Sequence, residues 1–199
     1  MTISAKDVKA LRDRTGAGMM DCKRALEETG GDIEAAVDYL RAKGSAKAAK
    51  RAEKTANEGT IGHYTHFDGR TAVLVEVNCE TDFVANTDDF RQLAKDLAMH
   101  IASAAPTAVS HEDIPAELVE RERKVYEEQV REEGKPEELA GKIVEGKLNR
   151  WFKESTLLAQ PFVKNPDQSI AELITEVSVK TGEKIEVARF ARFRLGESD

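Results

Sequence analysis

The chain has 199 residues and a formal net charge of −7; 34% of its residues are charged and 40% are hydrophobic. This length allows one or two domains, and the apolar content suffices for a core beneath a heavily charged surface. The negative charge argues against generic nucleic-acid binding, which needs a basic footprint. No apolar run could cross a membrane and no signal-peptide core is present, so we expect a cytoplasmic protein without membrane contact.

Residues 1–45 predict three short helices, because helix-breaking residues at Thr15–Gly18 and Gly30–Gly31 separate three apolar stretches. Ser4 and Asp32 are suitable caps for the first and third helices. Helices this short are not stable alone. We therefore expect them to pack together as a small three-helix bundle.

The segment 46–57 contains no large apolar side chain and is rich in alanine and lysine. This composition predicts a helical linker and not part of a core. Its basic residues form a broad face, which suits either plain solvation or contact with an acidic partner.

Beyond the linker the apolar pattern changes to alternation, which predicts β-strands. Ile61, Thr65 and Phe67 alternate with polar positions, and Asp68-Gly69 is a strong hairpin turn because glycine tolerates positive φ. A second strand follows the turn, and its apolar face consists of Val73, Val75, Val77 and Cys79.

The junction from Asn78 to Phe90 lies between this strand and the best amphipathic helix of the chain, which Thr87 caps and Pro106 ends. A strand-to-helix junction can present side chains to a partner. Phe83, within it, suits two interpretations. It either staples the helix start to the sheet or contacts another molecule.

Residues 115–155 predict two charged helices joined by a short turn, and therefore an antiparallel helical hairpin. Residues 160–166, with two prolines, predict an extended connector. After a further helix, Lys184–Leu195 predicts a third strand for the sheet. The residues expected on one face of that strand are Ile185, Val187, Arg189, Ala191 and Phe193.

The predicted fold is therefore α+β: an N-terminal three-helix bundle and a helical linker precede a small antiparallel three-stranded sheet packed with helices and a helical hairpin. The expected domains are residues 1–45, the linker 46–57 and a core over 58–199.

No enzymatic site can be assembled from the sequence. It contains no glycine-rich phosphate loop, and His63 and His66 fall on opposite sides of a predicted strand. Cys22 and Cys79 offer no metal-ligand spacing and predict reduced thiols. We therefore expect no catalytic residues, no metal and no cofactor. These patterns leave a protein-interaction adaptor as one interpretation. A second is a nucleic-acid-binding protein that uses Arg189, Arg192 and Arg194.

Three long motifs, in order, resemble those of bacterial elongation factor Ts: Leu11 to Leu26, Glu76 to Ala85, and Gly134 to Val163. The resemblance covers essentially the whole chain. It implies a ubiquitin-associated-like (UBA-like) fold for the N-terminal bundle. It also implies that the protein is a guanine nucleotide exchange factor, which binds the GDP-bound GTPase elongation factor Tu, promotes GDP release without covalent chemistry and allows GTP to bind.

The same resemblance assigns the partner contacts. It implies that Arg12, Met19 and Met20 touch the nucleotide-binding domain of elongation factor Tu. It also implies that Thr81, Asp82, Phe83 and Val84 reach the region of its magnesium and phosphates.

Longer family members carry a second sheet-bearing subdomain between the core helix and the hairpin, and this chain passes almost directly from one to the other. The short form should therefore have one sheet. A homodimer is one way for it to recover the missing surface.

Overall fold

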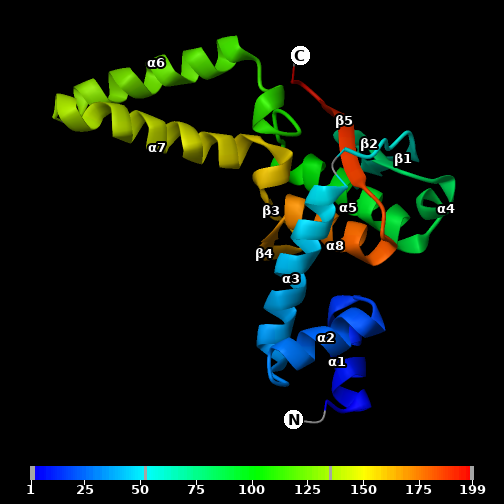
Figure 1. Cartoon of the computed structure of the whole chain (residues 1–199). Coiled ribbons are helices and arrows are strands. Elements are labelled where there is room, and N and C mark those ends of the chain that lie inside the picture. Colours follow the sequence, from blue (N-terminus) through cyan, green and yellow to red (C-terminus); the bar gives the residue numbers. More distant parts are fainter. Residues whose placement is uncertain (1–2, 52, 135, 198–199) are drawn as a thin grey trace. The chain divides into compact units, whose positions relative to one another are not determined.

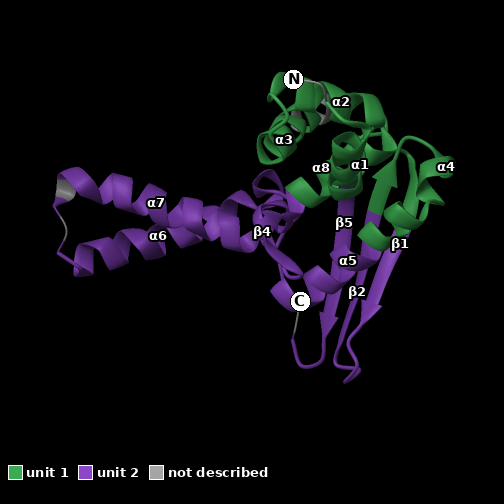
Figure 2. Cartoon of the chain, turned by 90° about the horizontal axis from the view of Figure 1, so that it is seen from below, with its two compact units in different colours: residues 1–60, 77–93, 172–186 green, residues 61–76, 94–171, 187–199 purple. Residues whose placement is uncertain are grey.

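The computed structural model describes residues 3–51, 53–134 and 136–197. It has the α+β fold predicted from the sequence, with a three-stranded antiparallel sheet, N-terminal helices and a long helical hairpin (Figure 1). The chain divides into two compact units (Figure 2). The first unit comprises residues 1–60, 77–93 and 172–186, and the second comprises residues 61–76, 94–171 and 187–199.

The first unit begins with the predicted three-helix bundle. Its helices are α1 (Ala5–Thr15), α2 (Met19–Glu28) and α3 (Ile33–Lys50). The Ser4 hydroxyl caps α1 by accepting a hydrogen bond of 3.1 Å from the Asp7 N–H, and Gly16 ends it with φ of 66°. The bundle encloses its own apolar core, whose most buried members are Leu11, Cys22, Ala25, Leu26 and Ala36.

Helix α3 continues through residues 46–50, so the first part of the expected linker is helical and joins the bundle without a break. Gly44 lies within α3 and faces α8 (Ile170–Thr181), where a Cβ atom would lie 2.9 Å from a Val179 methyl carbon. Arg41 and Glu172 form an ion pair between the same two helices. Close packing, and not helix termination, therefore accounts for glycine here. The division into domains 1–45, 46–57 and 58–199 stays a prediction.

The sheet contains β1 (Glu58–Thr65), β2 (Thr71–Cys79) and β5 (Ile185–Arg194) in the order β1-β2-β5. The predicted turn joins β1 to β2: Gly69 has φ of 69°, and the His66 N–H donates to the Thr71 carbonyl at 2.8 Å. The expected apolar face of β2 is buried along its whole length, at Val73, Val75, Val77 and Cys79. The third strand is also confirmed.

Strand β1 buries the opposite face from the one that its apolar residues mark. Ile61, within the strand, is 55% exposed, and Phe67, in the turn after it, is 93% exposed. The buried position is Gly62, where an added Cβ would lie only 2.4 Å from the Ala94 carbonyl oxygen of α5 (Asp88–Ala104). The helix backbone approaches the strand so closely that only glycine fits, and this contact decides which face is covered.

Strand β5 follows the predicted alternation only in its first half. Ile185 and Val187 are buried, but Ala188 and Arg189 are both exposed, and Phe193 is 62% exposed. The alternation of buried and exposed residues therefore breaks down partway along the strand. The prediction that one face holds all of the alternate residues from Ile185 to Phe193 is wrong for the second half of the strand.

Helix α5 is the amphipathic helix expected after Thr87. The Thr87 hydroxyl accepts a hydrogen bond of 3.4 Å from the Phe90 N–H at its start. The helix ends at Ala104, just before Ala105, whose φ is 47°. Its inner stripe is fully packed, and includes Phe90, Leu93, Ala94, Leu97, Ala98 and Ile101.

In the second unit, α6 (Ala116–Glu132) and α7 (Glu137–Ser155) form the predicted antiparallel hairpin (Figure 1). A small cluster of Val130, Val144 and Leu148 is buried between them. Ion pairs join their outer faces, with Arg123 2.6 Å from Glu145 and Lys147 3.2 Å from Glu133.

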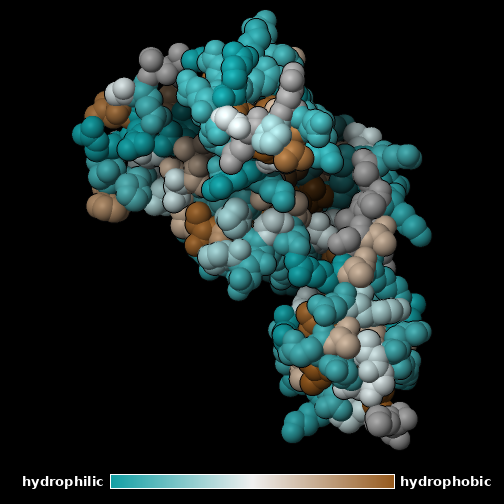
Figure 3. Space-filling model, turned by 90° about the vertical axis from the view of Figure 1, so that its left-hand side faces the viewer, coloured by the Kyte–Doolittle hydropathy of each residue, from teal (hydrophilic) through white to brown (hydrophobic). Residues whose placement is uncertain are grey.

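The face of the molecule drawn in Figure 3 is mostly hydrophilic, with small and separated hydrophobic areas.

The predicted extended connector is more ordered than expected. The 3₁₀ turn η1 (His111–Asp113) precedes α6, and a second one, η2 (Leu157–Ala159), follows α7. The strands β3 (Pro161–Phe162) and β4 (Asn165–Ser169) then pair antiparallel as a second, two-stranded sheet, so the prediction of a single sheet is wrong. The buried His100 holds this segment, because its Nδ1 accepts a hydrogen bond of 3.3 Å from the Val163 N–H. Its Nε2 lies 2.9 Å from the Gln160 side-chain oxygen, so the neutral imidazole donates there.

Candidate functional site

The junction after β2 contains a one-turn helix, α4 (Asp82–Ala85), which the sequence patterns do not predict. Thr81 is its N-cap, with extended backbone, and its hydroxyl accepts a hydrogen bond of 3.4 Å from the Val84 N–H. The Thr81 carbonyl accepts from the Ala85 N–H at 3.2 Å and from the Cys79 thiol at 3.1 Å. The Cys79 thiol, at the end of β2, and the Thr81 cap therefore fix where the strand ends and the turn begins.

The four predicted site residues, Thr81–Val84, divide into two pairs; we call this segment the 81–84 turn. Val84 is 5% exposed and anchors the turn to the core, while Thr81 is occupied as the cap. Asp82 and Phe83 project into solvent, and Phe83 is 78% exposed. This exposure contradicts the interpretation of Phe83 as a staple between helix and sheet. A buried phenylalanine side chain gains about 1.5–3 kcal/mol, so an exposed one on a fixed turn suits contact with a partner.

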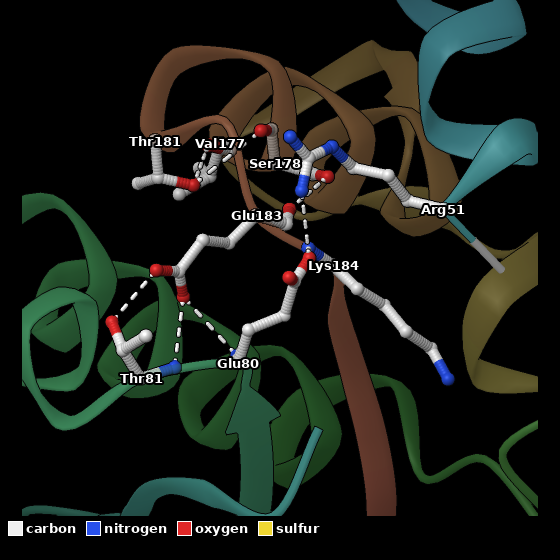
Figure 4. Close-up of polar contacts among 8 residues, drawn as sticks. All are labelled: Arg51, Glu80, Thr81, Val177, Ser178, Thr181, Glu183 and Lys184. Atoms are coloured by element: carbon white, nitrogen blue, oxygen red, sulfur yellow. Dashed lines mark hydrogen bonds and ion pairs between the residues drawn. The ribbon is translucent and has the colours of Figure 1, made fainter. Parts of the chain in front are cut away.

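A distant carboxylate holds the turn from the outside. Glu183, in the loop between α8 and β5, accepts hydrogen bonds from the N–H groups of Thr81 and Glu80, at 3.0 and 3.1 Å, through one oxygen. Its other oxygen accepts from the Thr81 hydroxyl at 2.7 Å (Figure 4). The loop itself is tied to α8, because the Ser178 hydroxyl donates to the Glu183 carbonyl.

Glu80, in turn, accepts a hydrogen bond from the segment that contains Glu183. One of its carboxylate oxygens accepts from the Lys184 N–H at 2.7 Å and lies 2.9 Å from an Arg51 guanidinium nitrogen (Figure 4). The Lys184 N–H, together with the Arg51 charge, lowers the pKa of the Glu80 carboxyl below its ordinary value. Arg51 directly follows the last residue of α3. Through Arg51, the end of α3 is therefore connected to Glu80, just before the 81–84 turn.

Sequence reasoning misses Glu183 entirely. The two ends of this contact lie 102 residues apart, and no spacing or periodicity connects them. The one local signal is an acid that follows a glycine just before the last predicted strand, and this pattern is common in ordinary surface turns.

The second predicted set lies on the N-terminal bundle. Arg12 is exposed on α1, and Met19 and Met20 begin α2 with 55% and 71% of their surfaces exposed. None of the three belongs to the apolar core of the bundle. Both predicted sets fall in the first unit, but no hydrogen bond or ion pair joins them within the part of the chain that the structure describes.

The described residues offer little support for a metal site, a reactive cysteine or a membrane-spanning helix. Among the described residues, no group of histidines, cysteines and acids could hold a metal ion. Cys22 and Cys79 are buried, and burial raises the pKa of both thiols, which leaves them poor nucleophiles. None of the helices in the described ranges could span a membrane.

The arginines considered for nucleic-acid binding are all paired with acids. Arg189 lies 2.8 Å from Glu76, while Arg192 and Arg194 both contact Glu197, at 2.7 and 3.3 Å. These neighbours offset the positive charge that a phosphate backbone would need.

Comparison with known proteins agrees with the resemblance of the three motifs. A family model described as Elongation factor TS matches residues 14–197. Elongation factor Ts of Desulfosudis oleivorans is 56% identical over 98% of this chain and 99% of its own length. The proteins of the same name from Heliobacterium modesticaldum and Geobacter sulfurreducens are 55% and 53% identical, over 98% and 99% of this chain and 91% of each relative.

Proposed function

The chain belongs to the elongation factor Ts family, and on that premise we propose that it is the guanine nucleotide exchange factor for elongation factor Tu in translation elongation. It binds elongation factor Tu with GDP, promotes GDP release and allows GTP to bind. It acts in the cytoplasm as a binding protein and not as an enzyme, without a cofactor and without direct contact to nucleic acid.

The observation that supports this proposal most strongly is the exposure of Phe83 on a turn whose own backbone is held on both sides. Phe83 enters an apolar crevice of the partner and displaces the elements that hold its magnesium ion. Asp82, beside it, disturbs the magnesium shell by charge or hydrogen bonding. Magnesium demands near-octahedral oxygen geometry, so small displacements of its ligands weaken it and the phosphates it binds.

An exchange factor must bind the nucleotide-free partner more tightly than the nucleotide-bound partner. By thermodynamic linkage, the nucleotide then weakens the factor's binding by the same ratio. The 81–84 turn supplies this difference, because its contacts form fully only when magnesium and GDP are loosened.

The N-terminal bundle contributes affinity. Met19 and Met20 form an adaptable apolar contact on the nucleotide-binding domain of elongation factor Tu, and Arg12 supplies an ion pair. All three are exposed, so they are available without rearrangement of the bundle.

A second copy of the chain is the other partner that we propose. The outer face of the sheet exposes one apolar side chain from each strand: Ile61 at 55%, Leu74 at 51% and Phe193 at 62%. Such a face suits a two-fold interface, in which the same patch meets itself. It offers the short form a replacement for the subdomain that longer family members carry.

The test is the release of labelled GDP from elongation factor Tu, followed after mixing with an excess of unlabelled GDP. The chain should accelerate release strongly. A plain adaptor, which is the competing function, would bind elongation factor Tu and leave the release rate unchanged. That result would overturn the proposal.

A further inference from the structure

Glu183 lies far from the 81–84 turn in sequence, yet every hydrogen bond described for its carboxylate comes from residues 80 and 81. We propose that Glu183 is a positioning residue for nucleotide exchange, which fixes the base of the turn so that Asp82 and Phe83 are presented in one orientation before the partner binds. This inference rests on the proposed function.

The geometry of the contact indicates positioning and not an ordinary surface ion pair. Both oxygens of Glu183 are used, and their three donors are two backbone N–H groups and one hydroxyl of consecutive residues. Backbone donors fix the path of the main chain, whereas a lysine or arginine partner would fix only a mobile side chain. Among the described residues, Glu183 forms no ion pair that would compete with this role.

The turn needs such outside support. Helix α4 has only four residues, and one helical turn is not stable by itself. Of its residues only Val84 and Ala85 are buried, while the two that face the partner have no packing to hold them. The orientation of Asp82 and Phe83 therefore depends on how firmly Thr81 is held.

Glu80 closes the contact from the other side. It accepts the Lys184 N–H, so each of two adjacent segments donates a main-chain N–H to a carboxylate of the other. Reciprocal bonds of this kind resist sliding of the end of β2 along the start of β5. The Arg51 contact with Glu80 extends the same network to the end of α3.

Preorganisation acts on the step in which the turn engages the partner. Without Glu183, the partner must order the turn at the moment when magnesium and GDP are displaced. The first encounter, in which Met19, Met20 and Arg12 supply the contacts, is unaffected. Loss of Glu183 should therefore lower the maximal release rate and leave the half-saturating concentration of the factor nearly unchanged.

The experiment compares Glu183→Ala, Glu183→Gln and Glu186→Ala with the unsubstituted chain in the GDP-release assay, at several factor concentrations. Glu183→Ala should lower the maximal rate about tenfold, which is the cost of ordering roughly one residue. Glu183→Gln keeps an oxygen for the two N–H groups and should restore most of the rate. Glu186→Ala, the control, removes an equal charge that pairs with the Lys184 side chain, and should retain the full rate.

Amide hydrogen exchange of the free factor provides a readout independent of elongation factor Tu. Glu183→Ala should speed exchange at the Glu80 and Thr81 N–H groups while the amides of α5 stay protected. Unchanged exchange at these two positions, or a maximal rate equal to that of Glu186→Ala, would overturn the inference. If Phe83→Ala also retained full activity, the proposed function of the turn would fail as well; if only Glu183→Ala did, the positioning role alone would fail.

Discussion

Glu183 and Thr81 are joined twice, by a hydrogen bond of 3.0 Å from the Thr81 N–H and one of 2.7 Å from its hydroxyl. The same hydroxyl accepts the Val84 N–H, so one threonine both caps α4 and connects it to the α8–β5 loop. The turn that presents Phe83 is therefore held by a residue at its first position. Changes at that position should affect local stability and exchange together.

Replacing Thr81 by alanine removes the cap and the hydroxyl contact with Glu183. The free energy of unfolding should fall by about 1 kcal/mol, the usual cost of losing a helix cap. Thr81→Ser keeps the hydroxyl and should retain most of this stability. Denaturant unfolding of the two variants measures the difference, and equal stabilities would contradict the role of the hydroxyl.

Replacing Met19 and Met20 together by alanine should weaken binding to elongation factor Tu. Both side chains are largely exposed, so the free energy of unfolding should change little. If the partner buries them, the half-saturating concentration should rise about tenfold or more, because burial of such a side chain is worth more than about 1 kcal/mol. Asp38→Ala, on the exposed face of α3, is a matched control that should bind normally.

The outer sheet face predicts the state of association. Phe193→Glu places a charge in the exposed patch and should convert a dimer to a monomer, because an unpaired charge opposes burial against a second copy. Leu139→Glu changes a similarly exposed residue on α7 and should not do so. Analytical ultracentrifugation of both variants decides, and a monomeric unsubstituted chain would contradict the proposed homodimer.

Stability should also depend on pH through His100. Burial lowers the pKa of His100 below its ordinary value of 6.5, so the unfolded chain binds its proton more readily than the folded chain does. The His100 contribution is therefore fully present above about pH 6.5, and the free energy of unfolding decreases as the pH falls below that value. Protonation also removes the acceptor for the Val163 N–H.

Denaturant unfolding at several pH values between about 5 and 8 measures this dependence. His100→Gln should flatten the decrease between about pH 6.5 and 5, whatever its effect on absolute stability. His63→Gln, at an exposed position of β1, should leave it intact. An undiminished slope in His100→Gln would contradict the assignment.

Much of the fold follows from local patterns. Strand β2 and helix α5 each carry one strongly apolar face, and in both the pattern predicts the residues that are buried. The face of β1 could not be predicted this way, because Ile61 and Phe67 mark the side that stays exposed. Its buried side is set by the close approach of α5 to Gly62, a tertiary contact that alternation does not contain.

The candidate site divides in the same way. The segment from Thr81 to Val84 is identified through a motif, but its division into an exposed pair and an anchored pair requires the structure. Glu183 could not be predicted, since a carboxylate that accepts distant backbone N–H groups leaves no periodic signal in the sequence. Residues that position a site through the main chain will generally escape sequence reasoning for this reason.

Phe83 and Asp82 are the residues proposed to cause GDP release, and the Phe83→Ala, Asp82→Ala double substitution tests this role in the GDP-release assay. Both side chains are exposed, so the fold should be retained. Loss of the phenylalanine contact alone should lower the maximal rate of GDP release from elongation factor Tu by roughly 10-fold to 100-fold. The doubly substituted chain should fold and still bind elongation factor Tu, but release GDP at close to the uncatalysed rate. Full exchange activity would refute the role of these two residues.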